Sequence, residues 1–210
     1  MSHLVLLGDS IFDNRVYVSP EPDVRHQLQA RLGAGRSVTL LAVDGHVTAD
    51  VARRQLQRVP KDATHLVISV GGNDALRHAS ILGERASSVA EAVERLAQAQ
   101  STFAAAYSEM IGAVRQLGLP TSVCTIYDAN YPEPHRRLAV TALALFNDVI
   151  TRAAFQRGLP LIDLRLICNE PSDYANPIEP SSQGGDKIAA AIAAMVVGSA
   201  TGRPVSSVWV

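Results

Sequence analysis

Five short apolar runs, separated by longer amphipathic segments, constrain the fold of this 210-residue chain more than any other feature. The runs cover residues 4–7, 38–43, 66–70, 122–127 and 161–162. Runs of this length without polar alternation are typical of strands that are buried on both faces. They predict a parallel five-stranded sheet with helices on both sides. The expected fold is therefore a three-layer α/β/α sandwich of the flavodoxin-like kind.

Three amphipathic segments between and after these runs predict helices. The longest covers residues 87–117, and Gly118 followed by Pro120 is a common signal for the end of a helix. Two more helices are expected over residues 138–155 and 181–197. The apolar side chains of the long helix recur at spacings of three and four, or sums of these, so we expect one buried stripe. It consists of Val93, Leu96, Phe103, Tyr107, Met110, Val114 and Leu117.

Composition narrows the class of protein. With 47% hydrophobic and 19% charged residues, a chain of 210 residues can bury a large core, so we expect one domain over residues 1–210. A formal net charge of −1 argues against a nucleic-acid partner or a polybasic membrane patch. Cys124 and Cys168 stand in apolar surroundings, far apart in the sequence, and are expected to be buried and reduced.

Signals for membranes, secretion and metals are missing from the sequence. No apolar run reaches the roughly 18 residues of a membrane span, and the N-terminus lacks the basic and apolar regions of a signal peptide. A cytoplasmic protein is therefore expected. Because no side chains have metal-ligand spacing, neither a metal nor an organic cofactor is expected. Residues 201–210 are expected to lie on the domain as a tail, and the sequence leaves the oligomeric state open.

Polar and glycine residues follow three of the expected strands directly. Gly8, Asp9 and Ser10 follow the first strand, Asp44 and Gly45 follow the second, and residues 72–74 follow the third. Parallel strands joined by right-handed crossovers have their carboxyl ends at one edge of the sheet, where open α/β sheets bind ligands. We therefore expect these three segments to meet in one crevice.

Each segment contains a residue suited to acyl-transfer chemistry. Ser10, at the start of an expected helix, would present its hydroxyl close to helical N–H groups. The N–H of Gly45 and the side-chain amide of Asn73 would be donors for negative charge that develops on a substrate oxygen. Taken singly, each has an ordinary interpretation: Ser10 and Asn73 are common helix caps, and Gly45 is a common turn residue.

Together these segments resemble a known family. The stretches LLGDSIFDN at 6–14, VDGHV at 43–47 and VGGNDA at 70–75 are similar, in kind and order, to the motifs of the SGNH hydrolases, also called GDSL-type esterases and lipases. The resemblance implies that Ser10 is the nucleophile. It also implies that the Ser10 N–H, the Gly45 N–H and the Asn73 side chain form an oxyanion hole, and that the substrate is a small-molecule ester.

The family's last motif, Asp-x-x-His before the final helix, is altered here. The matching stretch runs from Asn176 to Glu179, so that Asn176 stands where the family has its Asp and Glu179 where it has its catalytic His. No histidine occurs after His135. The resemblance therefore places the catalytic base at Glu179 and the residue that orients it at Asn176, both with a changed side chain.

Three interpretations of this departure remain open. In the first, Glu179 is the base. The reference pKa values of about 4.3 for Glu and about 6.5 for His correspond to a loss of about 3 kcal/mol in proton affinity. Burial of the carboxyl would raise the pKa of Glu179 and recover part of this loss. Alternatively, His46 or His78, both close to the crevice in the sequence, takes the role of the base. In the third interpretation the site is catalytically impaired, and residual catalysis comes from the oxyanion hole alone.

The function expected from the sequence is hydrolysis of a carboxylic ester through a Ser10 acyl-enzyme. The alternative is a catalytically impaired protein of the same fold that binds a small ligand or a partner. A nucleotide-binding, flavodoxin-like protein is disfavoured, because no phosphate-cradling glycine pattern follows the first strand. Tyr127, Tyr131 and Tyr174 follow strands or lie in loops, so they are candidates either for a pocket lining or for ordinary surface positions. Arg77, close after Asn73, is a candidate contact for an anionic substrate, although a solvated arginine is the favoured interpretation.

Overall fold

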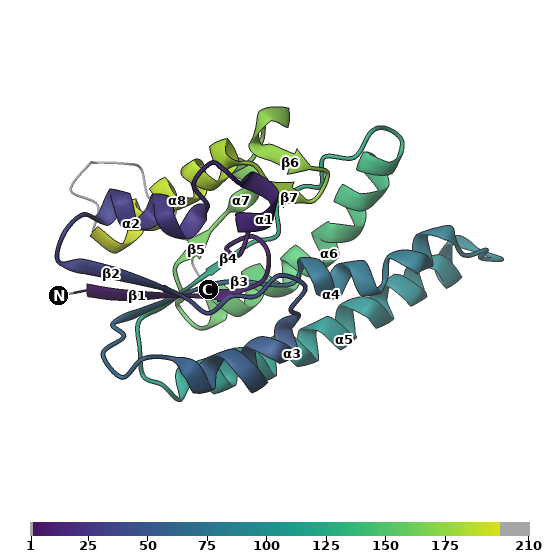
Figure 1. Cartoon of the computed structure of the whole chain (residues 1–210). Coiled ribbons are helices and arrows are strands. Elements are labelled where there is room, and N and C mark those ends of the chain that lie inside the picture. Colours follow the sequence, from purple (N-terminus) through teal and green to yellow (C-terminus); the bar gives the residue numbers. More distant parts are fainter. Residues whose placement is uncertain (1, 198–210) are drawn as a thin grey trace.

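The computed structural model describes residues 2–197, and its elements are arranged as in Figure 1. The strands are β1 (Ser2–Gly8), β2 (Arg36–Leu40), β3 (His65–Ser69), β4 (Thr121–Cys124), β5 (Leu161–Ile162), β6 (Tyr174–Asn176) and β7 (Glu179–Pro180). The α-helices are α1 (Arg15–Val18), α2 (Val24–Leu32), α3 (Thr48–Asp50), α4 (Gly72–Arg77), α5 (Val89–Arg115), α6 (His135–Gln156), α7 (Leu164–Ile167) and α8 (Ser182–Val197). A π-helical turn, η1 (Val51–Gln55), and the 3₁₀ turns η2 (Leu56–Arg58), η3 (Ala79–Gly83) and η4 (Pro171–Asp173) complete them.

The first five strands form one parallel sheet in the order β2-β1-β3-β4-β5. This is the strand order of the flavodoxin-like fold, and the predicted three-layer α/β/α sandwich is confirmed. β6 and β7 form a separate antiparallel hairpin beyond the sheet. The five expected strands are all present, although β2 and β4 end earlier than their apolar runs.

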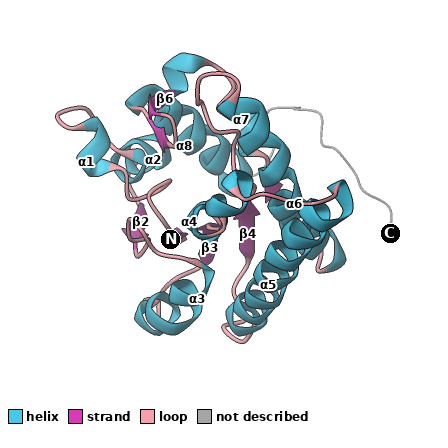
Figure 2. Ribbon diagram, turned by 90° about the vertical axis from the view of Figure 1, so that its right-hand side faces the viewer, coloured by secondary structure: helices cyan, strands magenta, loops and turns pink. Residues whose placement is uncertain are grey.

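Two apolar cores lie on opposite faces of the sheet. In β1, Val5 and Leu7 face a core with α5, α6 and η1, whereas Leu4 and Leu6 face a core with α2, α7 and α8. This alternation follows from the two-residue period of a strand. Because both faces of β1 are covered, its whole run is apolar. Figure 2 shows α3 and α5 on one side of the sheet and α2 and α8 on the other.

The long helix α5 packs on the sheet along only part of its length. Its stripe is buried from Phe103 to Val114, as predicted, but Val93 is 56% exposed and Leu117 is also exposed. Val93 is exposed because the N-terminal half of α5 and the start of α6 extend beyond the ends of the strands (Figure 1), whereas Leu117 lies past Arg115, where α5 ends. Helix α6 begins three residues earlier than expected, at His135.

Several other expectations can be compared with the structure. Cys124 and Cys168 are buried and free. Helix α6 is long and apolar enough to cross a membrane by length and composition alone, but Phe146, Ile150 and Ala154 on it pack in the core beside α5, as in a core helix. The expected tail at 201–210 lies outside the described residues.

Candidate active site

Ser10 lies in a sharp turn directly after β1. Gly8 at the end of β1 has φ +134°, and a Cβ atom there would lie 1.7 Å from the Ser69 carbonyl oxygen, so only glycine fits. The turn closes through hydrogen bonds from the N–H groups of Phe12 and Asp13 to the Asp9 carbonyl. The expected helix starting at Ser10 is therefore absent, because a tight turn precedes the four-residue helix α1.

The Ser10 hydroxyl donates a hydrogen bond to Glu179. Ser10 Oγ lies 3.0 Å from Glu179 Oε1, and both residues are only 6% exposed. Glu179 begins β7, the second strand of the β6–β7 hairpin, which lies over the carboxyl end of the sheet (Figure 1). The residue at the altered position of the last motif thus contacts the expected nucleophile across 169 residues of sequence.

Burial makes the Glu179 carboxyl more basic than a carboxyl in water. It raises the pKa of Glu179 to about 7, opposed by the hydrogen bond from Ser10 and assisted by the nearby charge of Asp44. The second oxygen, Oε2, is buried and has no hydrogen-bond partner among residues 2–197. Burial also raises the pKa of Asp9 to about 8, and the charge of Glu179 adds to this effect. Two carboxyl groups with raised pKa values therefore line the cavity at Ser10.

Hydrogen-bond donors remain available on the three residues that were expected to hold an anionic oxygen. Within residues 2–197, the N–H groups of Ser10 and Gly45 donate to no protein acceptor. Asn73 Nδ2 donates one hydrogen to the His46 carbonyl at 3.0 Å, and an amide nitrogen carries a second. This bond ties α4 to the segment that carries Gly45. Gly45 itself has φ +80°, in the left-handed region that favours glycine.

Gln55 fixes the Gly45 segment to the end of β1, and sequence reasoning missed it. Its side chain accepts from the Gly8 N–H at 2.8 Å and donates to the Gly8 carbonyl at 2.7 Å. The same amide nitrogen donates to His46 Nδ1 at 2.9 Å. Gln55 is buried at the end of η1 and belongs to no motif, so a single sequence carries no signal for this role.

The alternative bases are placed differently from Glu179. His46 directs Nδ1 to Gln55, and His78 lies beside the Phe146 ring, with ring centroids 6.4 Å apart. Neither histidine hydrogen-bonds to Ser10 in the described part of the chain. Arg77 is exposed and lies outside the set of residues that line the cavity at Ser10.

Asn176 does not orient Glu179. Its side-chain oxygen accepts a hydrogen bond from the Ile178 N–H at 2.9 Å and so closes the turn of the hairpin. The expected hydrogen bond to the Glu179 carboxylate is absent, because the antiparallel β6–β7 pair leaves the exposed Asn176 in the turn while Glu179 is buried. The assignment of Asn176 as an orienting residue is therefore corrected.

Ser10, Asn73 and Glu179 line one cavity of about 470 Å³, together with Asp9, Tyr127 and Tyr131. Gly45 is exposed and lies outside this lining, and Tyr174 also lies outside it. Tyr174 donates instead to the carbonyls of Asp128 and Cys168. Within residues 2–197 no group of three His, Cys, Asp or Glu side chains is arranged to hold a metal ion.

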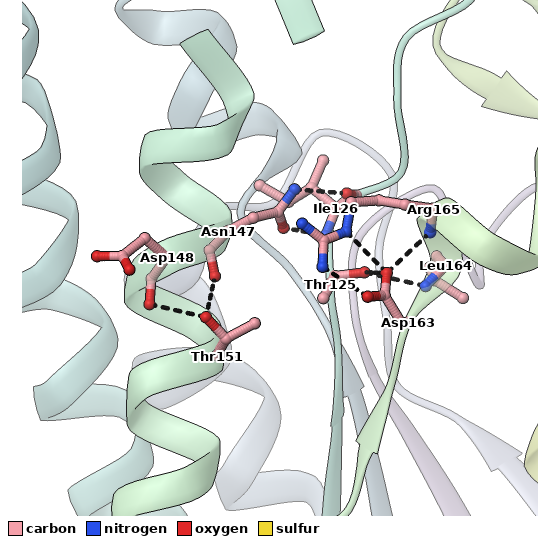
Figure 3. A network of polar contacts seen from close by, with 8 residues as sticks. All are labelled: Thr125, Ile126, Asn147, Asp148, Thr151, Asp163, Leu164 and Arg165. Carbon is pink, nitrogen blue, oxygen red and sulfur yellow. Dashed lines mark hydrogen bonds and ion pairs between the residues drawn. The ribbon is translucent and has the colours of Figure 1, made fainter. Parts of the chain in front are cut away.

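Residues in the loop after β4 hydrogen-bond to α6 on one side and to the hairpin that carries Glu179 on the other. Figure 3 shows Asn147 of α6 bound to the backbone of Ile126, accepting from its N–H and donating to its carbonyl, both at 2.8 Å. Thr125, one residue earlier, donates to Asp163 at 2.9 Å. Tyr127, which follows Ile126, donates to the carbonyl of Ile178 at 2.7 Å. Ile178 is the residue directly before Glu179. The position of Glu179 thus depends on a continuous set of hydrogen bonds from α6.

Solved structures of similar fold are esterases and lipases. Lipase Lip_vut3 from a goat rumen metagenome is 19% identical with a TM-score of 0.74, covering 95% of this chain and 99% of that one. The extracellular lipase of Streptomyces rimosus is 18% identical with a TM-score of 0.69, covering 91% and 98%. The M. smegmatis aryl esterase is 14% identical with a TM-score of 0.67, covering 94% and 99%. At these identities the likeness shows the fold alone.

Sequence comparison identifies the family. No protein of curated function matches the chain significantly. The family model of the GDSL-like lipase/acylhydrolase family, however, matches residues 6–186. The match extends over Ser10, Gly45, Asn73 and Glu179, and thus over every residue that the site geometry singles out. The chain therefore belongs to the GDSL-like lipase/acylhydrolase family.

Proposed function

We propose that the protein hydrolyses carboxylic esters through an acyl-enzyme on Ser10, with Glu179 as the general base. The observation that carries the proposal is the 3.0 Å hydrogen bond from Ser10 Oγ to Glu179 Oε1, at the wall of a cavity. A nucleophile and a base within hydrogen-bond reach are the geometric requirement for activating a serine hydroxyl. Membership of an acylhydrolase family and the fold shared with lipases and an aryl esterase support the reaction class.

In the first half of the reaction, Ser10 is acylated. Glu179 accepts the Ser10 hydroxyl proton as Oγ bonds to the ester carbonyl carbon. The carbonyl oxygen becomes an anion that is held by the N–H groups of Ser10 and Gly45 and the second hydrogen of Asn73 Nδ2. When the C–O bond to the alcohol breaks, the Glu179 carboxylic acid returns the proton to the departing oxygen, and the alcohol leaves.

In the second half, water releases the acid. Glu179, again a carboxylate, accepts a proton from water as its oxygen bonds to the acyl carbon. The same three donors stabilise the second tetrahedral anion. The bond to Ser10 Oγ breaks, Oγ regains a proton from Glu179, and the carboxylic acid leaves. Neither half requires a metal or an organic cofactor.

A glutamate can replace histidine here because of its environment. An ordinary glutamate, with a pKa near 4.3, is about 10² times less basic than histidine. Burial raises the pKa of Glu179 to about 7, which is the range in which general bases act best at neutral pH. The hydrogen bond from Ser10 lowers the pKa of Glu179, but by less than burial raises it.

A reactive-serine probe tests the proposal. We expect an alkyl fluorophosphonate to label the wild-type chain once, and Ser10→Ala to abolish both labelling and ester hydrolysis. Glu179→Gln should slow labelling and lower turnover by more than about tenfold, because the amide cannot accept the proton. Ser69→Ala, a change at another serine of the cavity lining, is the matched control and should still be labelled.

Other outcomes contradict the assignment. Full activity of Glu179→Gln, with loss of activity in His46→Ala or His78→Ala, would make a histidine the base. Absence of labelling in a folded wild type that still binds an ester would identify a protein that binds without hydrolysing.

A further inference from the structure

The cavity at Ser10 is much larger than the reacting groups require. Its volume of about 470 Å³ lies within the range of sites for whole small molecules. Beyond Ser10, Asn73 and Glu179, it extends along α4, η3 and the first halves of α5 and α6. These are the helical segments that project past the sheet in Figure 1. Part of the substrate larger than the ester group therefore has a place in the structure.

The cavity exists because small side chains face the space between the projecting helices. Ala99 of α5 and Ala139 and Ala142 of α6 line it, and so do Ala75 of α4 and Ala79 of η3. Farther along α5 and α6, where the helices reach the sheet, Phe103 and Phe146 fill the space between them, with ring centroids 5.0 Å apart. The interhelical space is thus closed by aromatic rings at the sheet and open towards the projecting ends.

The lining away from Ser10 selects an uncharged, apolar guest. Leu96, Ile81, Leu143 and Ile126 contribute apolar walls. His78 and His135 also line the cavity, whereas no lysine or arginine among residues 2–197 does. Leu76, Leu82 and Leu138 line it and are also 43–49% exposed, so they form an apolar mouth. At the Ser10 end, the buried carboxylate of Glu179 would repel a negatively charged guest.

The part of an ester that stays on the enzyme between the two chemical steps is its acyl group. The alcohol must depart before water attacks. Asp44 and Gly45 are exposed, and Asp44 lies close enough to Glu179 for its charge to raise the pKa of that carboxyl. The alcohol therefore has a path to solvent on this side. The apolar cavity between the helices is suited to the group that remains bonded to Ser10.

We propose that this cavity is an acyl site for unbranched, uncharged chains of about eight to twelve carbons, with Ala142 of α6 in its wall midway along the chain. The inference rests on the proposed function. The apolar part of the lining on α6 runs from Leu138 to Phe146, which are eight positions apart, or about 12 Å at 1.5 Å per residue. An extended chain advances about 1.2 Å per bond, since three backbone bonds span at most about 3.6 Å. About ten bonds therefore match the length of the cavity.

A series of p-nitrophenyl esters from acetate to palmitate, below their aggregation concentrations, tests the acyl site. We expect kcat/KM to rise by up to about fourfold for each added methylene, as apolar surface leaves water, and to pass a maximum near eight to twelve carbons. Ala142→Trp should lower the decanoate-to-acetate ratio of kcat/KM by at least about fiftyfold, because an indole occupies the path of the chain. Ala144→Trp, on the exposed face of the same helix, should keep the wild-type ratio.

Two results overturn the proposal: a wild type that prefers acetate, or an unchanged decanoate-to-acetate ratio in folded Ala142→Trp. If no ester is hydrolysed, calorimetry with Ser10→Ala separates the two proposals. Binding of methyl decanoate but not of methyl propanoate would support the acyl site while the hydrolase proposal fails. Binding of neither ester to that folded variant overturns the acyl site as well.

Discussion

At the scale of single residues, the site depends on how burial changes ordinary side chains. Glu179 is a common surface residue type, yet at 6% exposure beside Ser10 its carboxyl loses most of its hydration, and its pKa rises to about 7. Its environment supplies the basicity that an imidazole has in water. Asn176, which the family motif pairs with this position, instead caps the turn of the hairpin.

The pH dependence of the reaction should follow Glu179. Only the ionised carboxylate can accept the Ser10 proton, so kcat/KM should be half-maximal near pH 7 and fall about tenfold per pH unit below it. Initial rates with a neutral ester between pH 5 and 9 measure this profile. An activity that stays constant down to pH 5 would mean that the base has an ordinary carboxyl pKa or is another group.

Gly45→Ala should damage catalysis more than stability. A side chain at φ +80° is strained by about 1–2 kcal/mol, and relief of the strain would move the Gly45 N–H from the anion. We expect a loss of about 100- to 1000-fold in kcat, the range for an oxyanion donor. Gly35→Ala is the control, since Gly35 has φ +87° in an exposed loop before β2. A similar loss of activity in both variants would assign the effect to general destabilisation.

At the scale of elements, the loop after β4 couples α6 to the catalytic hairpin. Asn147 holds the backbone of Ile126, and the following Tyr127 holds the carbonyl before Glu179. Helix α6 therefore serves two purposes: one face packs in the core, and its first turns line the cavity. The double role explains why its predicted boundaries, based on apolar spacing alone, missed the first turn at His135.

Asn147→Leu should lower the free energy of unfolding by about 2–4 kcal/mol. The change leaves the Ile126 N–H and carbonyl without a partner in a largely buried setting, at about 1–3 kcal/mol for each group. Urea unfolding followed by circular dichroism measures the difference. Asp148→Ala removes only the ion pair with Arg152 next to it and should cost less than about 1 kcal/mol. Equal effects of the two substitutions would contradict the role of Asn147.

At the scale of the whole molecule, the active site lowers stability at alkaline pH. The buried carboxyls of Asp9 and Glu179 have raised pKa values, about 8 and about 7, and so keep their protons in the folded state after the unfolded chain has lost them. Between the ordinary carboxyl pKa and these values the folded state binds more protons. Their contribution to stability is therefore complete at low pH and is lost as pH rises towards 8.

Asp9→Asn should remove part of this pH dependence. Relative to the variant, the wild-type free energy of unfolding should fall between pH 5.5 and pH 8.5, with a slope of at most about 1.4 kcal/mol per pH unit for this group. Urea titrations of both proteins at three pH values measure it. A difference that is constant with pH would show that Asp9 has an ordinary pKa in the folded protein.

Local patterns in the sequence determined the layers of the fold and the residues at the strand ends. Apolar runs such as residues 66–70 and the stop signal at Gly118 depend on neighbours a few positions away, so their periodicity and turn chemistry can be read directly. The family motifs added Ser10, Gly45 and Asn73 for the same reason, since each follows a recognisable strand.

Only the tertiary structure decided which groups meet. Packing, or a hairpin without a strong local pattern, sets the geometry of three features: the hydrogen bond between Ser10 and Glu179, the Gln55 bridge to Gly8 and the turn closed by Asn176. The cavity arises where α5 and α6 leave the sheet, which is also why Val93 is exposed although its spacing fits a buried stripe. A helix's apolar period marks the face that avoids water, but how far that face is covered depends on elements distant in the sequence.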